Sequence, residues 1–240
     1  ITKEVNMDAY ELLSKRNHIH KYKEDKIPPK ELIDDLLYKA WKTTPSKNNF
    51  MPYHVNVLGP EHVDEKASIT KKCMVNKKQI NEEKIPKHYS KDHGDKWEED
   101  GSNPSFIHIS TAPYVLVFTQ RICEPNAYYA ETIRRGDFYE QMHEEYFGEI
   151  QRTTSVEIGW FTSNLTNLCV EQGLDTSTLL CFPYHHKKWN KGWEDISWLS
   201  GPVVLLCSLG YSKQSRREYL HPKNRARDKK PEKETVVVWR

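Results

Sequence analysis

The clearest pattern of apolar and polar positions is a wide apolar stripe near the N-terminus. Its members recur at i, i+1, i+4 and i+5: Leu32, Ile33, Leu36, Leu37, Ala40 and Trp41. This spacing predicts an amphipathic helix. Pro28 and Pro29 precede the stripe, where a missing N–H is tolerated, and Pro45 follows it. We therefore expect a helix from about Pro29 that ends before Pro45, after a shorter helix over residues 6–15.

Four internal apolar runs bounded by turn-forming residues predict strands. They span residues 55–58, 113–119, 176–182 and 202–211. A further β-type run, residues 235–239, stands at the end of a long polar arm. An apolar terminal strand needs a sheet edge, so we expect this run to complete the sheet of a second subunit.

Further helices are expected between these strands. The best defined covers residues 154–173, because Thr154 and Glu157 have capping-box spacing and Gly173 suits a left-handed cap. Small residues within it, Gly159 and Ser163, allow another helix to approach closely. A helix to about residue 80 and an aromatic-rich helical segment over 126–150 complete the set.

A single domain over residues 1–240 accommodates these elements. Residues 82–105 are rich in charged residues and read as an irregular insertion, because the apolar strand at 113 resumes the core. Hydrophobic residues make up 37% of the chain, which is enough for a core. The net charge is only +2, which argues against a surface devoted to nucleic acid or acidic lipid.

The five cysteines are odd in number and widely spread, with no CxxC pair, which disfavours a zinc site or a disulfide framework. The simplest setting is therefore reducing and cytoplasmic. No apolar run reaches the length of about 18 residues that a membrane span requires, and no signal peptide is visible. We expect no membrane partner and no metal.

Short motifs indicate more closely which class of protein this is. A basic cluster, Arg16-Asn17-His18-Ile19-His20, precedes the first long helix. The turn Pro45-Ser46-Lys47-Asn48-Asn49 then leads into a strand. This order resembles that of the FMN-dependent nitroreductase family, from about residue 10 to residue 239.

The resemblance implies roles for the basic cluster. Arg16 matches the family's phosphate-binding arginine, and a guanidinium fork suits phosphate oxygens. Asn17, His18 and His20 complete the segment, with His18 in place of the usual serine and His20 in place of the usual arginine or lysine. His20 falls where a cation lies near flavin N1. The alternative is a solvated basic loop.

The turn corresponds to the family's Pro-Ser-x-x-Asn-x-Gln-Pro-Trp motif, whose backbone and polar side chains contact the flavin. Four positions match: Pro45, Ser46, Asn49 and Pro52. Met51 and Tyr53 replace the glutamine and tryptophan. An ordinary helix–turn–strand connection favours the same residue types and stays open as the alternative.

Other cofactor contacts are implied farther along the chain. Asn76 is similar to the asparagine that binds the flavin pyrimidine edge, although a solvated helix face explains it equally well. Leu180 and Cys181 match backbone positions opposite flavin N5; Cys181 is alternatively a plain buried thiol. Arg227 and Lys229, in the arm of residues 221–240, match a segment that closes over the phosphate.

The family implies an α+β fold with a mainly antiparallel sheet of four or five strands, an intertwined homodimer, and one FMN at each subunit interface. It also implies hydride transfer from NADH or NADPH through flavin N5 to a small-molecule electron acceptor: a nitroaromatic, quinone, enone or flavin. Residues 126–147 form the candidate lid; a helix in the dimer core is the alternative.

Two other functions stay open at this stage. One is a reductive dehalogenase resembling iodotyrosine deiodinase. The other is a nucleic-acid-binding module that uses the basic C-terminal arm, which the near-neutral charge weakens. A yellow, flavin-containing protein favours the oxidoreductase over the nucleic-acid-binding module.

Overall fold

The computed structural model describes residues 8–16, 19, 21–73, 108–121, 123, 131, 134–135, 152–180, 196–201, 203–213 and 233–237. Several predicted site residues lie outside this set: Asn17, His18, His20, Asn76, Cys181, Arg227 and Lys229. The predicted insertion over 82–105 and nearly all of the candidate lid over 126–147 also lie outside it.

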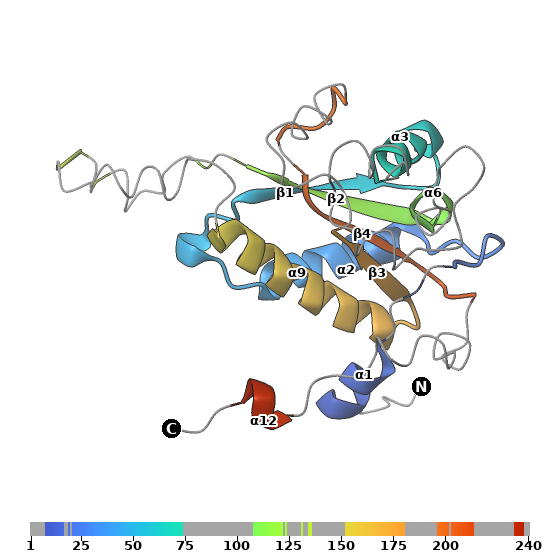
Figure 1. Ribbon diagram of the computed structural model, residues 1–240, viewed down its shortest axis with the longest axis horizontal. Helices are drawn as coiled ribbons and strands as arrows, with labels where there is room; N and C mark the ends of the chain where they lie inside the picture. Colours follow the sequence, from blue (N-terminus) through green and yellow to red (C-terminus); the bar gives the residue numbers. More distant parts are fainter. Residues whose placement is uncertain are drawn as a thin grey trace.

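A four-stranded sheet forms the centre of the fold (Figure 1). Its order is β1 (Tyr53–Leu58), β2 (Tyr114–Gln120), β4 (Val203–Gly210) and β3 (Asp175–Leu179), and each neighbouring pair is antiparallel. The two central strands are apolar and buried along nearly their whole length, whereas the edge strands carry exposed positions. The four internal strands are therefore confirmed, and so is the antiparallel α+β fold.

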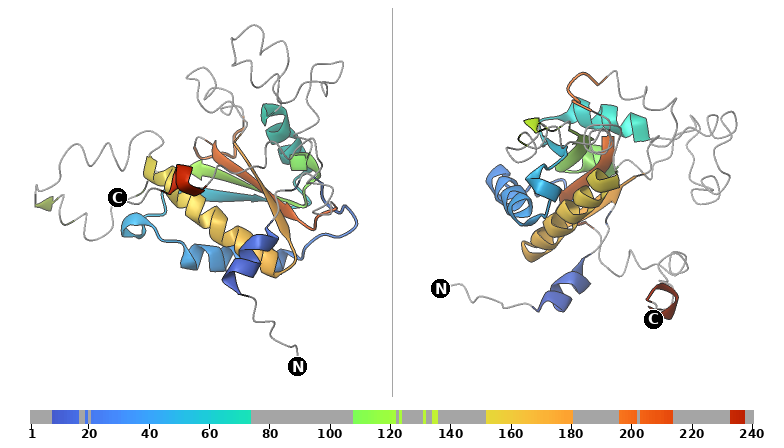
Figure 2. Two further views of the ribbon diagram at one scale, coloured as in Figure 1. Left: turned by 60° about the horizontal axis from the view of Figure 1, so that its bottom comes forward. Right: turned by 90° about the vertical axis from the view of Figure 1, so that its left-hand side faces the viewer.

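Helices cover both faces of the sheet (Figure 2). Alternate residues of β2 define the two sides, because successive side chains of a strand point to opposite faces. Leu116 and Phe118 pack in one core with α2 (Lys30–Thr43) and α9 (Arg152–Glu171). Val115 and Val117 pack in the other core with α3 (Val63–Cys73) and α6 (His108–Thr111).

The first helix ends at Lys15 as predicted but begins at Ala9, later than the expected residue 6. Asp8 caps α1 (Ala9–Lys15), its carboxylate accepting a hydrogen bond from the Tyr10 N–H at 3.1 Å. The predicted cap at Gly173 is confirmed. Gly173 has φ 70° after α9, and the Leu174 N–H donates to the Cys169 carbonyl at 2.8 Å, as a left-handed cap requires.

Within the described residues, no helix is long and apolar enough to cross a bilayer.

Two predictions about local structure are wrong. The helix α9 begins at Arg152, so Thr154 and Glu157 lie inside it and form no capping box. The strand expected over residues 235–239 does not begin as predicted, because Thr235 and Val236 belong to the short helix α12 (Lys233–Val236), and the Val237 N–H donates to the Lys233 carbonyl. Residues 238–239 lie outside the described residues. A β-prone sequence needs a neighbouring strand to form a ladder, and no strand pairing among the described residues involves residues 233–237.

Candidate functional site

The turn between α2 and β1 has a backbone conformation that its own residues do not favour. Its centre is η1 (Lys47–Asn49), and both Asn49 (φ 57°) and Met51 (φ 47°) have positive φ. Asparagine tolerates this region, but for other L-residues it costs about 1–2 kcal/mol. Met51 also precedes Pro52, which disfavours helical conformations further. Contacts from other parts of the chain must therefore stabilise the turn.

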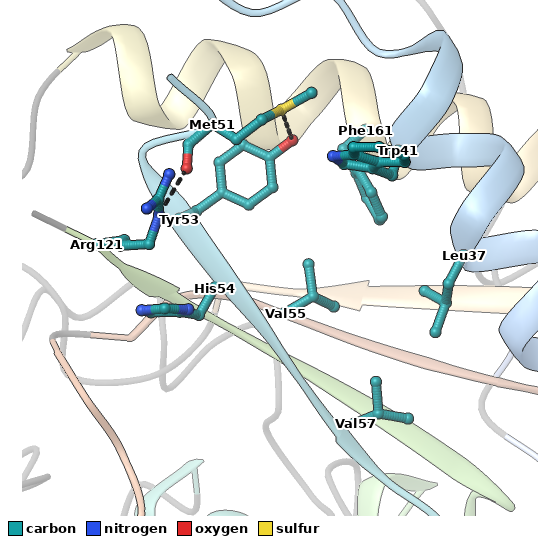
Figure 3. Close-up of a pocket in the computed structure, with 9 residues that line it drawn as sticks. All are labelled: Leu37, Trp41, Met51, Tyr53, His54, Val55, Val57, Arg121 and Phe161. Carbon is teal, nitrogen blue, oxygen red and sulfur yellow. Dashed lines mark hydrogen bonds between the residues drawn. The ribbon is translucent and has the colours of Figure 1, made fainter. Parts of the chain in front are cut away.

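Arg121 binds the carbonyl oxygens of the turn. Its Nε donates to the Met51 carbonyl at 3.1 Å, and its Nη2 donates to the Phe50 carbonyl (Figure 3). The Arg121 backbone N–H donates to the Pro52 carbonyl at 3.0 Å. Arg121 follows directly after β2, where Gln120 pairs with Tyr53, so the sheet register brings the guanidinium to the turn.

Glu157 and Ser46 bind the amide groups of the turn. The Lys47 N–H donates to Glu157 Oε1 at 2.9 Å, and the Met51 N–H donates to Ser46 Oγ at 2.8 Å. Glu157 is only 3% exposed and lies on the buried stripe of α9 one turn before Phe161. Its Oε2 is also buried and has no hydrogen-bond partner among the described residues.

A pocket of about 360 Å³ lies beside the turn, between α2 and the edge strand β1 (Figure 3). Its lining combines apolar side chains with Arg121 and His54: Leu37, Trp41, Met51, Tyr53, His54, Val55, Val57, Arg121 and Phe161. The Tyr53 hydroxyl donates to Met51 Sδ at 3.2 Å. Burial, reinforced by the Glu157 carboxylate, raises the Tyr53 pKa well above its ordinary value, so this hydroxyl stays protonated at neutral pH.

The predicted flavin-binding residues of the turn are accessible. Pro45 and Asn49 are exposed and Ser46 is half-buried. Ser46 Oγ accepts from Met51, and among the described residues its own hydroxyl hydrogen has no acceptor. Leu180 follows Leu179, the last paired residue of β3, and is 62% exposed. Leu180 and the turn therefore lie at the same end of the sheet.

Arg16 lies at the other end of the sheet. Tyr22 forms a bridge with Ser212, just beyond β4, and α1 contacts α9 near its C-terminal end (Figure 1). The turn, in contrast, contacts the start of α9 through Glu157. Six residues of β1 separate the two ends, about 20 Å at about 3.3 Å per residue. One chain therefore does not bring Arg16 and Asn49 together.

Arg121 belongs to none of the predicted motifs, and the capping-box prediction gave Glu157 the wrong role. A signal for Glu157 was present, because it lies four residues before Phe161 and eight before Leu165, on the buried side of the predicted helix. A carboxylate on such a stripe needs a buried partner. Arg121 is the first charged residue after a buried strand, but its acceptors are about seventy residues away in sequence.

Comparison with protein families matches residues 13–211 to the nitroreductase family. The match covers most of the chain, so the chain belongs to the nitroreductase family. A search of curated proteins finds no match.

Several solved structures share the fold. A BluB-like flavoprotein from Clostridium difficile 630 is 17% identical with a TM-score of 0.57, covering 98% of this chain and 100% of its own. A nitroreductase family protein from Streptococcus pneumoniae TIGR4 is 16% identical with a TM-score of 0.56, covering 97% and 100%. A gut-bacterial enone reductase of fatty acid saturation is 12% identical with a TM-score of 0.53, covering 88% and 91%.

Cys123 lies beside the turn, where burial makes its thiol a weak nucleophile. Its Sγ donates to the Phe50 carbonyl at 3.4 Å, and burial raises the pKa of the thiol despite the nearby Arg121. A raised pKa keeps the thiol protonated at neutral pH, so the reactive thiolate forms only at higher pH. We expect iodoacetamide to label Cys123 at least roughly tenfold more slowly than the unfolded chain at pH 8.

The labelling rate is measured by mass spectrometry of the Cys123 peptide across pH 7–10, in native and urea-unfolded protein. In native protein the rate should still rise above pH 9, beyond the pKa of about 8.5 of an ordinary cysteine. A native profile that levels off near pH 8.5 contradicts the assignment.

Proposed function

We propose that the protein is an FMN-dependent oxidoreductase that takes a hydride from NADH or NADPH and passes it to a small electron-poor acceptor. The observation that carries the proposal is the Ser46–Met51 turn. This turn holds the family's Pro-Ser-x-x-Asn motif in a fixed conformation, with Ser46 and Asn49 accessible. The nitroreductase family match and the flavoprotein fold support the same reading.

The described residues fit FMN in their chemistry. Ser46 and Asn49 provide hydroxyl and amide groups, which both donate and accept as the polar edge of a flavin requires. Arg16 is exposed, and its guanidinium has no hydrogen-bond or ion-pair partner within the part of the chain that the structure describes. A free guanidinium suits the phosphate of FMN.

Bound FMN supplies the redox chemistry, accepting and releasing a hydride at N5. The chain would supply position and electrostatics: Arg16 would hold the phosphate, and Ser46 and Asn49 would orient the ring. By the family resemblance, the backbone of Leu180 and Cys181 would also orient the ring. Asn76 would bind the pyrimidine edge, and Arg227 with Lys229 would bind the phosphate. Acceptors in this class include nitroaromatics, quinones, enones and flavins.

The direct test is the cofactor content of the purified protein. We expect a yellow protein that binds one FMN per chain and bleaches when NADH or NADPH is added without oxygen. A colourless protein that takes up no FMN on titration contradicts the proposal.

We expect the Arg16 side chain to bind the phosphate of FMN and no other part of the cofactor. We expect Arg16→Gln to weaken FMN binding roughly 10- to 100-fold, the range for losing a hydrogen bond to a charged group. Riboflavin lacks the phosphate, so its affinity should not change. Titration by flavin fluorescence measures both, with Lys39→Gln, an exposed lysine paired with Asp35, as the control. Equal losses for FMN and riboflavin contradict this role.

His20 is the proposed cation near flavin N1. An ordinary histidine has a pKa of about 6.5, so its positive charge, and the stabilisation of negative charge that it gives, is lost as pH rises through that value. We expect His20→Lys to flatten the pH dependence of the flavin potential between pH 5.5 and 8, measured by anaerobic redox titration. An unchanged slope removes His20 from this role.

We also propose that two copies form a homodimer. Arg16 and Asn49 lie at opposite ends of one chain's sheet, so a second copy supplies what one copy lacks. A suitable surface exists on α9, where Val156 and Trp160 are 46% and 48% exposed. Gly159 lies between them, and a Cβ added there meets nothing within 4 Å among the described atoms. This surface allows close approach of a second backbone.

We expect Trp160→Glu to weaken the dimer at least roughly tenfold, because buried tryptophans dominate many interfaces. Sedimentation equilibrium measures the dissociation constant. Val63→Glu is the control, since Val63 is similarly exposed but lies on α3, over the opposite face of the sheet. If both variants dimerise as the wild type does, the α9 surface is not the interface.

A further inference from the structure

We propose that Arg121 and Glu157 are positioning residues of the flavin site. They fix the conformation of the Ser46–Met51 turn and act on the cofactor through it, without touching it. This inference rests on the proposed FMN function. It assigns roles to two residues that belong to none of the flavin-binding motifs.

The two side chains bind complementary groups of the same turn. Arg121 donates to two successive carbonyls, those of Phe50 and Met51. Glu157 accepts from the Lys47 N–H at the other end of the turn. Asn49 and Met51 have positive φ. Asn49 lies between the two contacts in sequence, and the Met51 carbonyl is one of the acceptors. Both ends of the unfavourable backbone are therefore fixed by charged groups.

Two independent elements deliver these groups. Glu157 comes from α9, and Arg121 comes from the end of β2, whose register with β1 is fixed by six residue pairs. The turn is thus tied both to the helix layer and to the sheet. A shift of either contact alters the direction in which Ser46 and Asn49 point.

Packing alone does not explain Glu157. The core beside Glu157 is apolar on α9, with Ile158, Phe161 and Leu165 buried in it, and the other buried polar residues of this helix are uncharged threonines. A buried carboxylate is costly unless it makes strong hydrogen bonds, and a hydrophobic side chain of similar size would fill this space. The one hydrogen bond seen for Glu157 among the described residues goes to the turn.

The two contacts made at position 121 require an arginine side chain. A planar guanidinium presents several N–H donors at fixed angles, so Nε and Nη2 reach adjacent carbonyls together. A lysine has one nitrogen on a flexible stem and does not reproduce this fork. Arg121→Lys therefore preserves the charge while removing the paired contact.

The experiment compares FMN affinity and the visible spectrum of bound FMN among matched variants. Arg121→Lys and Glu157→Leu should each weaken FMN binding roughly 10- to 100-fold and shift the bound spectrum, as losing charged hydrogen bonds predicts. Glu157→Gln keeps an acceptor oxygen for Lys47 and should stay near wild type. Lys39→Arg, at the exposed ion pair with Asp35, is the control and should change nothing.

A rescue tests the conformational mechanism directly. Glycine adopts positive φ without a steric penalty. Adding Met51→Gly to Arg121→Lys should therefore restore much of the lost affinity and return the spectrum toward wild type. A purely structural role of Arg121 lowers the melting temperature of the apoprotein but leaves the holoprotein spectrum unchanged and is not corrected by this glycine.

Three results overturn the inference: wild-type affinity and spectrum in Arg121→Lys, equal losses in Glu157→Gln and Glu157→Leu, or no rescue by Met51→Gly. If Arg121→Lys does not fold, the two Glu157 variants decide the outcome. A wild-type protein that binds no FMN overturns the proposed function and this inference with it. A wild-type protein that binds FMN, with variants that bind equally well, overturns this inference alone.

Discussion

The antiparallel pairing of β1 with β2 is the constraint on which the candidate site depends. It places Gln120 opposite Tyr53, and so brings Arg121 next to the turn that leads into β1. The same pairing leaves β1 at the edge of the sheet, beside the pocket under α2. A turn with two positive φ angles is stable here because the sheet register places Arg121, which donates hydrogen bonds to the carbonyls of the turn.

The sheet also separates the parts of the site. Residues before α2 pack against the far end of β4, whereas the turn and Leu180 lie at the near end. Within one chain these groups stay about 20 Å apart, the length of a short strand. Under the proposed function, a flavin that contacts both groups would require a second copy, and cofactor binding and association would then be parts of one equilibrium.

The sequence predicted the structural features that depend on local residue patterns. The stripe of α2, the four apolar strands and the cap at Gly173 follow from periodicity and residue type. The sequence did not predict contacts between distant residues. Glu157 matched a capping box by spacing, yet its carboxylate accepts a hydrogen bond from the Lys47 N–H, 110 residues away. The terminal run was misassigned because strand preference is realised only where a partner strand exists.

Subunit complementation tests the shared site most directly. Arg16→Gln and Asn49→Gly each remove one part of the flavin site, and glycine keeps the positive φ of residue 49. Each variant alone should bind FMN weakly. After the two are unfolded and refolded together, random pairing should give about a quarter of the sites both native residues, and these should bind FMN with wild-type affinity. A mixture that binds no better than the separate variants contradicts a site built from two copies.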